Sequence, residues 1–236
     1  MNSQHKVAIV TGASQGIGAA LVKALRERGH AVVATSRGIK PSDDPGVLAV
    51  AGDIGRPETA ERVVAEAVKR FGQIDLLVNN AGIFIAKPFT QYSAEDFAST
   101  MATNAAGFFN ITQATAREME KRGRGHVVSI TTSLVDHAIA GVPSVLASLS
   151  KGGMNAATRS LAIEYAARGL RFNAVSPGII KTPMHPQATH ATLAGLHPMG
   201  HMGEIEDIVN AVLYLDGAPF VTGEILHVDG GQSAGH

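Results

Sequence analysis

Residues 11–18 read Thr-Gly-Ala-Ser-Gln-Gly-Ile-Gly, and this stretch decides the fold that the sequence predicts. It follows the short apolar run Val7-Ala8-Ile9-Val10 and precedes the segment from Ala19 to Arg28, whose apolar residues recur at helical spacing. A glycine loop that joins a strand to the start of a helix is typical of dinucleotide-binding proteins. Strand, loop and helix in this order favour that interpretation over a glycine-rich turn without a ligand.

The three glycines of the loop have different expected roles. Gly12 permits the sharp turn after the strand, and Gly16 lets the backbone approach a pyrophosphate. Gly18 allows the helix to pack closely on the strand, while the amino end of the helix faces the phosphates. We therefore expect residues 11–18 to hold a nicotinamide dinucleotide.

The rest of the chain repeats this alternation of short apolar runs and amphipathic segments. The predicted helices run from Pro57 to Phe71, from about Ala94 to Lys121 with a break near Asn104, and from Lys151 to Ala167. The further predicted strands are Ala31–Ala34, Val47–Val50, Asp75–Asn79, Val127–Ile130, Phe172–Val175 and Ile225–Val228. Helical crossovers between parallel strands place helices on both faces of the sheet. The sequence thus predicts an α/β fold, a single-domain, Rossmann-type, doubly wound parallel sheet of about seven strands.

Composition excludes several other classes of protein. The 236 residues suit one domain, and 20 basic and 20 acidic side chains give no net charge that would attract nucleic acid or a membrane surface. There is no Cys, which excludes disulfides and thiolate nucleophiles. No apolar stretch is long enough for a signal peptide or a membrane span, so we expect a cytoplasmic protein.

The spacing T-G-x-x-x-G-x-G and several later motifs resemble the short-chain dehydrogenase/reductase family. The later motifs are Asn79-Asn80-Ala81-Gly82, Asn104, Pro177-Gly178, Val221-Thr222-Gly223 and Val228-Asp229-Gly230-Gly231. They follow in the family's order over essentially the whole chain. The resemblance implies an oxidoreductase that transfers a hydride between a nicotinamide cofactor and a carbonyl or alcohol.

The residues that end the second strand imply a choice of cofactor. In the family an acidic residue there favours NAD, whereas this chain has Ser36-Arg37, and a guanidinium can pair bidentately with a 2′-phosphate. We expect NADP rather than NAD, with a solvated surface arginine as the alternative. By resemblance, the cofactor-binding residues are Thr11, Gly12, Ser14, Gln15, Gly16, Ile17, Gly18, Ser36, Arg37, Asp53, Ile54, Asn79, Ala81, Gly82, Lys151, Pro177, Gly178, Ile180 and Thr182.

The catalytic set that the resemblance implies is incomplete. The family uses a Tyr as proton donor four residues before a Lys, and here Lys151 is preceded by Ala147. Lys151 then keeps its ribose role or donates a proton itself through water, and Asn104 holds that water. The substrate-orienting hydroxyl is Thr132 by strand register or Ser133 by its proximity to Lys151, and Ser133 is preferred.

Another titratable residue, His137, is a candidate to replace the missing phenol as proton donor. His137 follows the expected fifth strand in the loop that borders substrate, and an imidazole suits proton transfer near pH 7. A polar loop histidine without a role is the alternative. Because an imine or an activated alkene makes less demand on an acid, the expected substrate is a small, largely apolar carbonyl, alcohol, imine or activated alkene. A catalytically silent NAD(P)-binding regulatory protein is the second hypothesis.

The stretch 183–203 has no clear secondary-structure pattern, and we expect it to form a substrate lid. Four of its residues, His185, His190, His197 and His201, suggest a metal site by number, but their spacing lacks the helical pair of a zinc protease. We expect lid or solvated histidines and no metal. The apolar content of the two long helices, about 103–121 and 151–167, predicts a homotetramer or homodimer.

Overall fold

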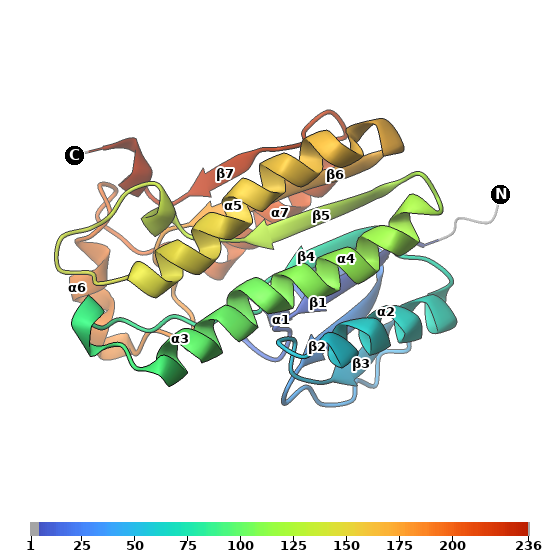
Figure 1. Cartoon of the computed structure of the whole chain (residues 1–236), viewed down its shortest axis with the longest axis horizontal. Coiled ribbons are helices and arrows are strands. Elements are labelled where there is room, and N and C mark those ends of the chain that lie inside the picture. Colours follow the sequence, from blue (N-terminus) through green and yellow to red (C-terminus); the bar gives the residue numbers. More distant parts are fainter. Residues whose placement is uncertain (1–4, 236) are drawn as a thin grey trace.

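A computed structural model describes residues 5–235 and shows a seven-stranded parallel sheet in the order β3-β2-β1-β4-β5-β6-β7 (Figure 1). The strands are β1 (Val7–Thr11), β2 (Ala31–Ser36), β3 (Val47–Ala51), β4 (Leu76–Asn79), β5 (Gly125–Ile130), β6 (Leu170–Pro177) and β7 (Ile225–Val228). The fold prediction is confirmed. The order of the strands reverses between β1 and β4, which is where ligands bind in such sheets.

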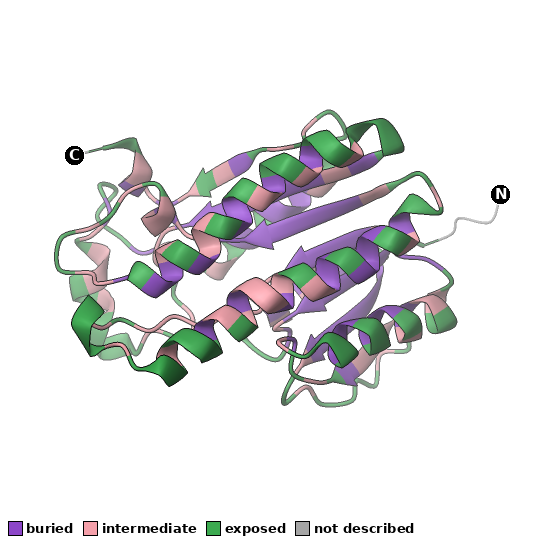
Figure 2. Cartoon of the chain, viewed as in Figure 1, coloured by how far each residue is buried: buried purple, intermediate pink, exposed green. Residues whose placement is uncertain are grey.

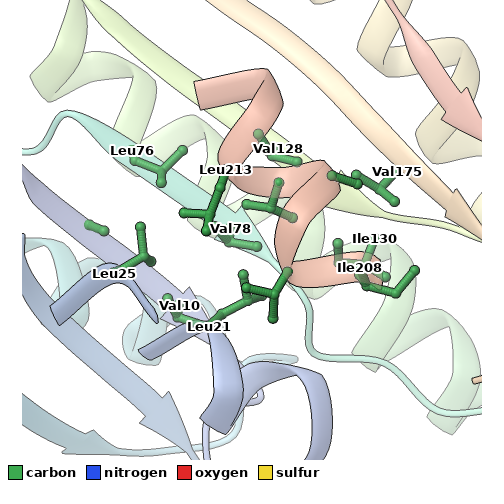
Figure 3. Packing of buried hydrophobic residues seen from close by; sticks show 14 of the residues in the cluster. Val10, Leu21, Leu25, Leu76, Val78, Val128, Ile130, Val175, Ile208 and Leu213 are labelled. Carbon is green, nitrogen blue, oxygen red and sulfur yellow. The ribbon is translucent and has the colours of Figure 1, made fainter. Parts of the chain in front are cut away.

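Helices cover both faces of the sheet. They are α1 (Gly16–Glu27), α2 (Pro57–Phe71), α3 (Ala94–Thr100), α4 (Gly107–Glu120), α5 (Val145–Tyr165), α6 (His190–Ala194) and α7 (Ile205–Gly217). Helices α1 and α7 pack on one face, where Leu21, Leu25, Ile208 and Leu213 meet the strand residues (Figure 3). The other face is covered by α2, α4 and α5. The sheet is therefore buried and the outward sides of the helices are exposed (Figure 2).

One expected feature of the helices is confirmed, and two helical segments differ from the expectation. The break near Asn104 is a π-helical turn, Met101–Ala106, that joins α3 directly to α4. Helix α5 begins at Val145, six residues earlier than predicted, so Lys151 lies in its second turn. Helix α7 lies in a region for which no helix was predicted. Its core residues Ile208, Val212 and Leu215 recur at helical spacing.

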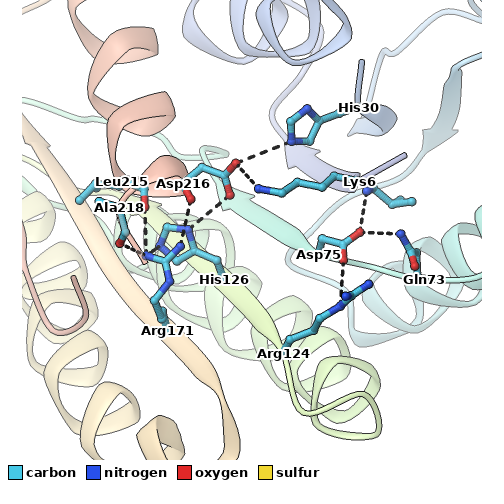
Figure 4. A network of polar contacts seen from close by, with 11 residues as sticks. Lys6, His30, Gln73, Asp75, Arg124, His126, Arg171, Leu215, Asp216 and Ala218 are labelled. Atoms are coloured by element: carbon cyan, nitrogen blue, oxygen red, sulfur yellow. Dashed lines mark hydrogen bonds and ion pairs between the residues drawn. The ribbon is translucent and has the colours of Figure 1, made fainter. Parts of the chain in front are cut away.

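A polar network closes the edge of the sheet where the strands begin (Figure 4). The Asp216 carboxylate lies 3.0 Å from Lys6 Nζ, 3.7 Å from His30 Nε2 and 3.8 Å from His126 Nδ1. Burial raises the pKa of Asp216, but these neighbours outweigh it and hold that pKa well below its usual range. Burial lowers the pKa of His126 to about 4, so its ring is neutral at pH 7. Because the network joins the end of α7 to β1 and β5, it supports the sheet from the edge opposite the carboxyl ends of the strands.

Within residues 5–235, no helix combines the length and the apolar character needed to cross a bilayer. The segment 183–203 contains a single 3-10 turn, Gln187–Thr189, followed by the short helix α6. Four of its residues, Pro183, Met184, His185 and Leu193, line the cavity described next.

Candidate active site

A cavity of about 800 Å³ opens at the carboxyl ends of the strands. Its walls come from the loops after β1, β2, β3, β4, β5 and β6, from the first turns of α5 and from the segment 183–203. The cavity thus occupies the reversal point of the strand order, between β1 and β4. Among the described residues that line it, the titratable ones are Arg37, Asp53, Lys151 and His185.

The glycine loop forms one wall through its backbone. Gly12 and Gly16 line the cavity with φ values of +66° and +53°, which favour glycine. A Cβ on Gly12 would lie 2.9 Å from Ala81 Cα, so the first and fourth strand ends approach too closely for a side chain. Gly18 lies beneath the cavity, where a Cβ would be 2.3 Å from the carbonyl oxygen of Gly12. This cradle of backbone N–H groups at a helix start fits a pyrophosphate.

Thr11 and Asn80 join the loops after β1 and β4. Thr11 Oγ1 accepts hydrogen bonds from the N–H groups of Asn80 and Ala81, both at 3.0 Å. Asn80 Nδ2 in turn donates to the carbonyl oxygens of Thr11 at 2.9 Å and Gly12 at 3.2 Å. Thr11 is buried and does not line the cavity, whereas Asn80 does. Thr11 therefore supports the glycine loop from behind.

The expected ribose contact Asn79 points away from the cavity. Its side chain is buried, and Nδ2 donates to Thr112 Oγ1 at 2.9 Å in the layer between β4 and α4. The following residues, Asn80, Ala81 and Gly82, line the cavity instead. The Asn79 side chain therefore faces α4, because alternate residues of a strand face opposite sides, and the expected ribose contact stays a prediction for its backbone.

The far end of the cavity fits an adenosine. It is lined by Ser36, Arg37, Asp53 and Ile54, the residues for which the sequence predicts contacts with the adenosine half of the cofactor. Ser36 Oγ is buried and has no hydrogen-bond partner within the described part of the chain. Arg37 is exposed at the rim. Of the remaining expected contacts, Ser14, Gln15, Ile17, Pro177, Gly178, Ile180 and Thr182 line the cavity.

Lys151 and Ala147 face the other end of the cavity from adjacent turns of α5. Lys151 Nζ donates to the carbonyl oxygens of Ile130 and Thr131, both at 3.1 Å, at the end of β5. Burial lowers the pKa of Lys151 to about 8. Lys151 therefore has a third N–H bond that neither carbonyl oxygen uses, and its ammonium lies one helical turn from Ala147.

Asn104 lies in the π-helical turn and contacts α5, the helix that carries Lys151 and Ala147. Its Oδ1 accepts from the N–H of Ile83 at 2.9 Å, and its Nδ2 donates to the Ile83 carbonyl at 3.0 Å and to Ser150 Oγ at 3.1 Å. The side chain is buried, and the neighbouring Thr103 lines the cavity instead. Asn104 therefore fixes the chain after β4 against α5.

The preferred serine does not reach the cavity. Ser133, the hydroxyl that the sequence favours, is buried outside the cavity lining, and its Oγ donates to Gln232 Oε1 at 2.8 Å. Thr132 lines the cavity and is the hydroxyl available to a substrate. The contact that turns Ser133 away comes from a residue near the carboxyl end of the chain, which strand register alone does not reveal.

The histidine that lines the cavity is His185, not His137. His137 is half-buried outside the lining. The lid residue His185 faces the cavity, and burial, with a further effect of His190, lowers the pKa of its imidazole. Sequence reasoning placed His185 among four lid histidines without distinguishing it. Across residues 5–235, no three His, Cys, Asp or Glu side chains are grouped so that they could hold a metal.

Comparison with known proteins gives consistent results. The family model described as Enoyl-(Acyl carrier protein) reductase matches residues 12–233. The chain is 36% identical to the 3-oxoacyl-[acyl-carrier-protein] reductase FabG of Vibrio cholerae, over 98% of this chain and 99% of that protein. It is 38% identical to a 3alpha-hydroxysteroid dehydrogenase of Mediterraneibacter gnavus, over 98% of each chain. The solved structure of ElxO with NADP bound superposes with a TM-score of 0.91 at 26% identity, over 98% of this chain and 100% of that one.

Proposed function

The chain belongs to the short-chain dehydrogenase/reductase family, and from this premise we propose that it is an NADP(H)-dependent oxidoreductase with an atypical proton donor. The observation that carries the proposal is the pair Lys151 and Ala147 on one wall of the dinucleotide-sized cavity. The lysine of the family's catalytic motif is present, and the residue four positions earlier carries no phenol. The bound NADP of the ElxO structure supports the choice of cofactor.

The lining near Lys151 supports a small, largely apolar substrate. Its apolar side chains are Ile83, Phe84, Leu134, Val142, Pro143, Met184 and Leu193. A hydroxyl from Thr132 and the imidazole of His185 add a few polar atoms that can orient one oxygen or nitrogen. A carbonyl, alcohol, imine or activated alkene on an apolar body fits this surface.

When bound, the cofactor supplies a hydride to the substrate carbon. The oxygen of a ketone then needs a proton, and we propose that Lys151 gives it, directly or through one water, and is reprotonated from solvent. Thr132 also lines the cavity, and we propose that its hydroxyl donates a hydrogen bond to that oxygen. An iminium already carries its proton, and an enone takes one at carbon from solvent. Both classes therefore make less demand on Lys151.

The test is an NADPH oxidation assay on panels of ketones, imines and enones, combined with a direct measurement of NADPH binding. We expect NADPH to bind and at least one panel to be reduced, with imines or enones preferred over simple ketones. Binding without any substrate-dependent oxidation would instead support the silent NAD(P)-binding regulatory protein.

Arg37→Ala is expected to weaken the binding of NADPH more than the binding of NADH. An exposed guanidinium that pairs with a 2′-phosphate contributes about 1.5 kcal/mol or more, which corresponds to roughly a tenfold higher KM. The KM for NADH should change less than twofold, since NADH lacks that phosphate. Lys40→Ala removes a cation that is also exposed, does not line the cavity and serves as the matched control. Equal effects of Arg37→Ala on both cofactors would contradict the assignment.

We also infer self-association, as a homotetramer or homodimer, through α4 and α5. Phe109 on α4 is 58% exposed, and Leu149 and Ile163 on α5 are 53% and 83% exposed. Exposed apolar side chains on adjacent helices are typical of an interface. Ile163→Asp should lower the mass measured by light scattering at micromolar concentration. A wild-type protein that is monomeric at that concentration would contradict the inference.

A further inference from the structure

His197 is a buried side chain that joins two walls of the cavity without lining it. Its Nε2 lies 3.0 Å from the backbone nitrogen of Ile179, and its Nδ1 lies 3.1 Å from the carbonyl oxygen of Leu193. Ile179 belongs to the loop after β6, and Leu193 belongs to α6 in the segment 183–203. Both of these partners line the cavity.

The chemistry of the partners determines the tautomer of the ring. A backbone N–H only donates, so Nε2 must accept from Ile179 and carries no proton. A carbonyl oxygen only accepts, so Nδ1 must carry the proton and donate to Leu193. The two contacts therefore assign the ring proton of His197 to Nδ1 and leave Nε2 as the acceptor for Ile179.

Two glycines approach the His197 side chain closely. A Cβ on Gly178 would lie 2.9 Å from His197 Nε2, and a Cβ on Gly230 would lie 3.3 Å from His197 Cβ. Both glycines belong to motifs that the sequence shows, Pro177-Gly178 and Asp229-Gly230-Gly231. A side chain at either position would crowd the side chain of His197.

A second contact holds the same stretch to the opposite side of the cavity. Gln232 Nε2 donates to the carbonyl oxygen of Leu196 at 3.1 Å, and Gln232 Oε1 accepts from Ser133 Oγ at 2.8 Å. Ser133 directly follows Thr132, which lines the cavity. The residues at the end of α6 are thus tied both to the loop after β6 and to the loop after β5.

We propose that His197 is a positioning residue that sets the lid and the loop after β6 at a fixed separation, through one hydrogen bond to each. This inference rests on the proposed function, in which the loop after β6 contacts the cofactor and the segment 183–203 covers the substrate. The bond to Ile179 then governs cofactor affinity, and the bond to Leu193 governs the KM of the substrate.

Two substitutions of His197 each remove one of its two hydrogen bonds and can keep the other. Gln places an amide near the position of Nε2, so His197→Gln can keep an acceptor for Ile179 and loses the donor to Leu193. Asn places an amide near the position of Nδ1, so His197→Asn can keep the donor to Leu193 and loses the acceptor for Ile179. The loss of one hydrogen bond changes an equilibrium constant about threefold to tenfold.

We expect His197→Asn to raise the Kd for NADPH about threefold to tenfold, and His197→Gln to leave it within twofold. Conversely, His197→Gln should raise the KM of the substrate by a similar factor with little change in kcat. His201→Gln, in an exposed lid residue whose ring contacts the adjacent Met202 carbonyl, is the matched control and should change neither constant. Parallel changes of both constants in the two His197 variants, or no change in either, would overturn the proposal.

Two further measurements keep the proposal testable. NADPH binding is followed by fluorescence without turnover, so a failure of the proposed reaction leaves that half of the pattern readable. Nitrogen NMR of histidine-labelled wild-type protein should show a His197 ring with Nδ1 protonated and Nε2 unprotonated at pH 7. A ring protonated on Nε2 would overturn the proposal even if neither variant folds.

Discussion

Ala147→Tyr is expected to raise the rate of ketone reduction by NADPH about 10²- to 10⁴-fold, the usual contribution of a positioned general acid. Ala147 lies one helical turn before Lys151 on α5, and both residues line the cavity. Residues four apart on a helix share a face, so a phenol at position 147 would project toward the space beside the Lys151 ammonium. That ammonium would lower the pKa of the new phenol and make it a better acid near pH 7.

The control for this gain is Ala147→Phe. It adds the same ring without the hydroxyl, so it fills the cavity equally and supplies no proton. We expect ketone reduction to rise in the Tyr variant alone, and reduction of imines or enones to fall in both, since each ring occupies substrate space. If the Tyr variant binds NADPH as the wild type does but reduces ketones no faster, the missing phenol is not what limits ketone reduction.

The parts of the fold that the sequence predicts are those with a local cause. The strands β1, β2 and β4 are buried on both faces, so each reads as a short apolar run. The glycine loop is recognisable because Gly12 needs a positive φ and Gly18 faces a carbonyl where a Cβ would clash. These requirements act within about ten residues of the loop, and a single sequence displays them.

The start of α5 is hard to predict because residues that favour turns are interspersed among its helix formers Leu146, Ala147 and Leu149. Ser148 and Ser150 precede Gly152 and Gly153, and such residues favour turns over helices. In the structure Ser150 Oγ donates back to the carbonyl oxygen of Leu146 at 2.7 Å, so its hydroxyl is satisfied within the helix. Packing of Leu146 and Ala147 against the protein core overrides the weak propensity.

The sequence predicts those parts of the candidate site that follow from the order of the strands in the sheet. The loops after β1, β2 and β6 line the cavity because parallel strands end at one edge of the sheet. The choice between Thr132 and Ser133 depends on Gln232, which lies 99 residues beyond Ser133. That His185 and not His137 lines the cavity depends in the same way on the path of the segment 183–203. No local pattern carries such long-range contacts.

Lys151 is expected to set the pH dependence of the proposed reaction. Since its pKa is lowered by burial to about 8, the ammonium form predominates at pH 7 and is lost as the pH rises through that value. Reduction needs the protonated form, so kcat/KM for ketone reduction should be level below pH 8 and fall about tenfold per pH unit above it. Alcohol oxidation needs the neutral amine and should rise over the same range. A reduction rate that stays level to pH 10 would contradict this role.

Lys151→Arg tests whether Lys151 acts through the proton that it donates or through its positive charge. Arg keeps a cation and several N–H donors for the carbonyl oxygens of Ile130 and Thr131, but it does not release a proton in the accessible pH range. We expect ketone reduction to fall about 10²- to 10⁴-fold while the Kd for NADPH stays within a few-fold of wild type. Lys151→Met should lose both activity and part of the cofactor affinity. An Arg variant that retains more than a tenth of wild-type activity would exclude Lys151 as the acid. His185, the imidazole that lines the cavity, would then be the next residue to replace.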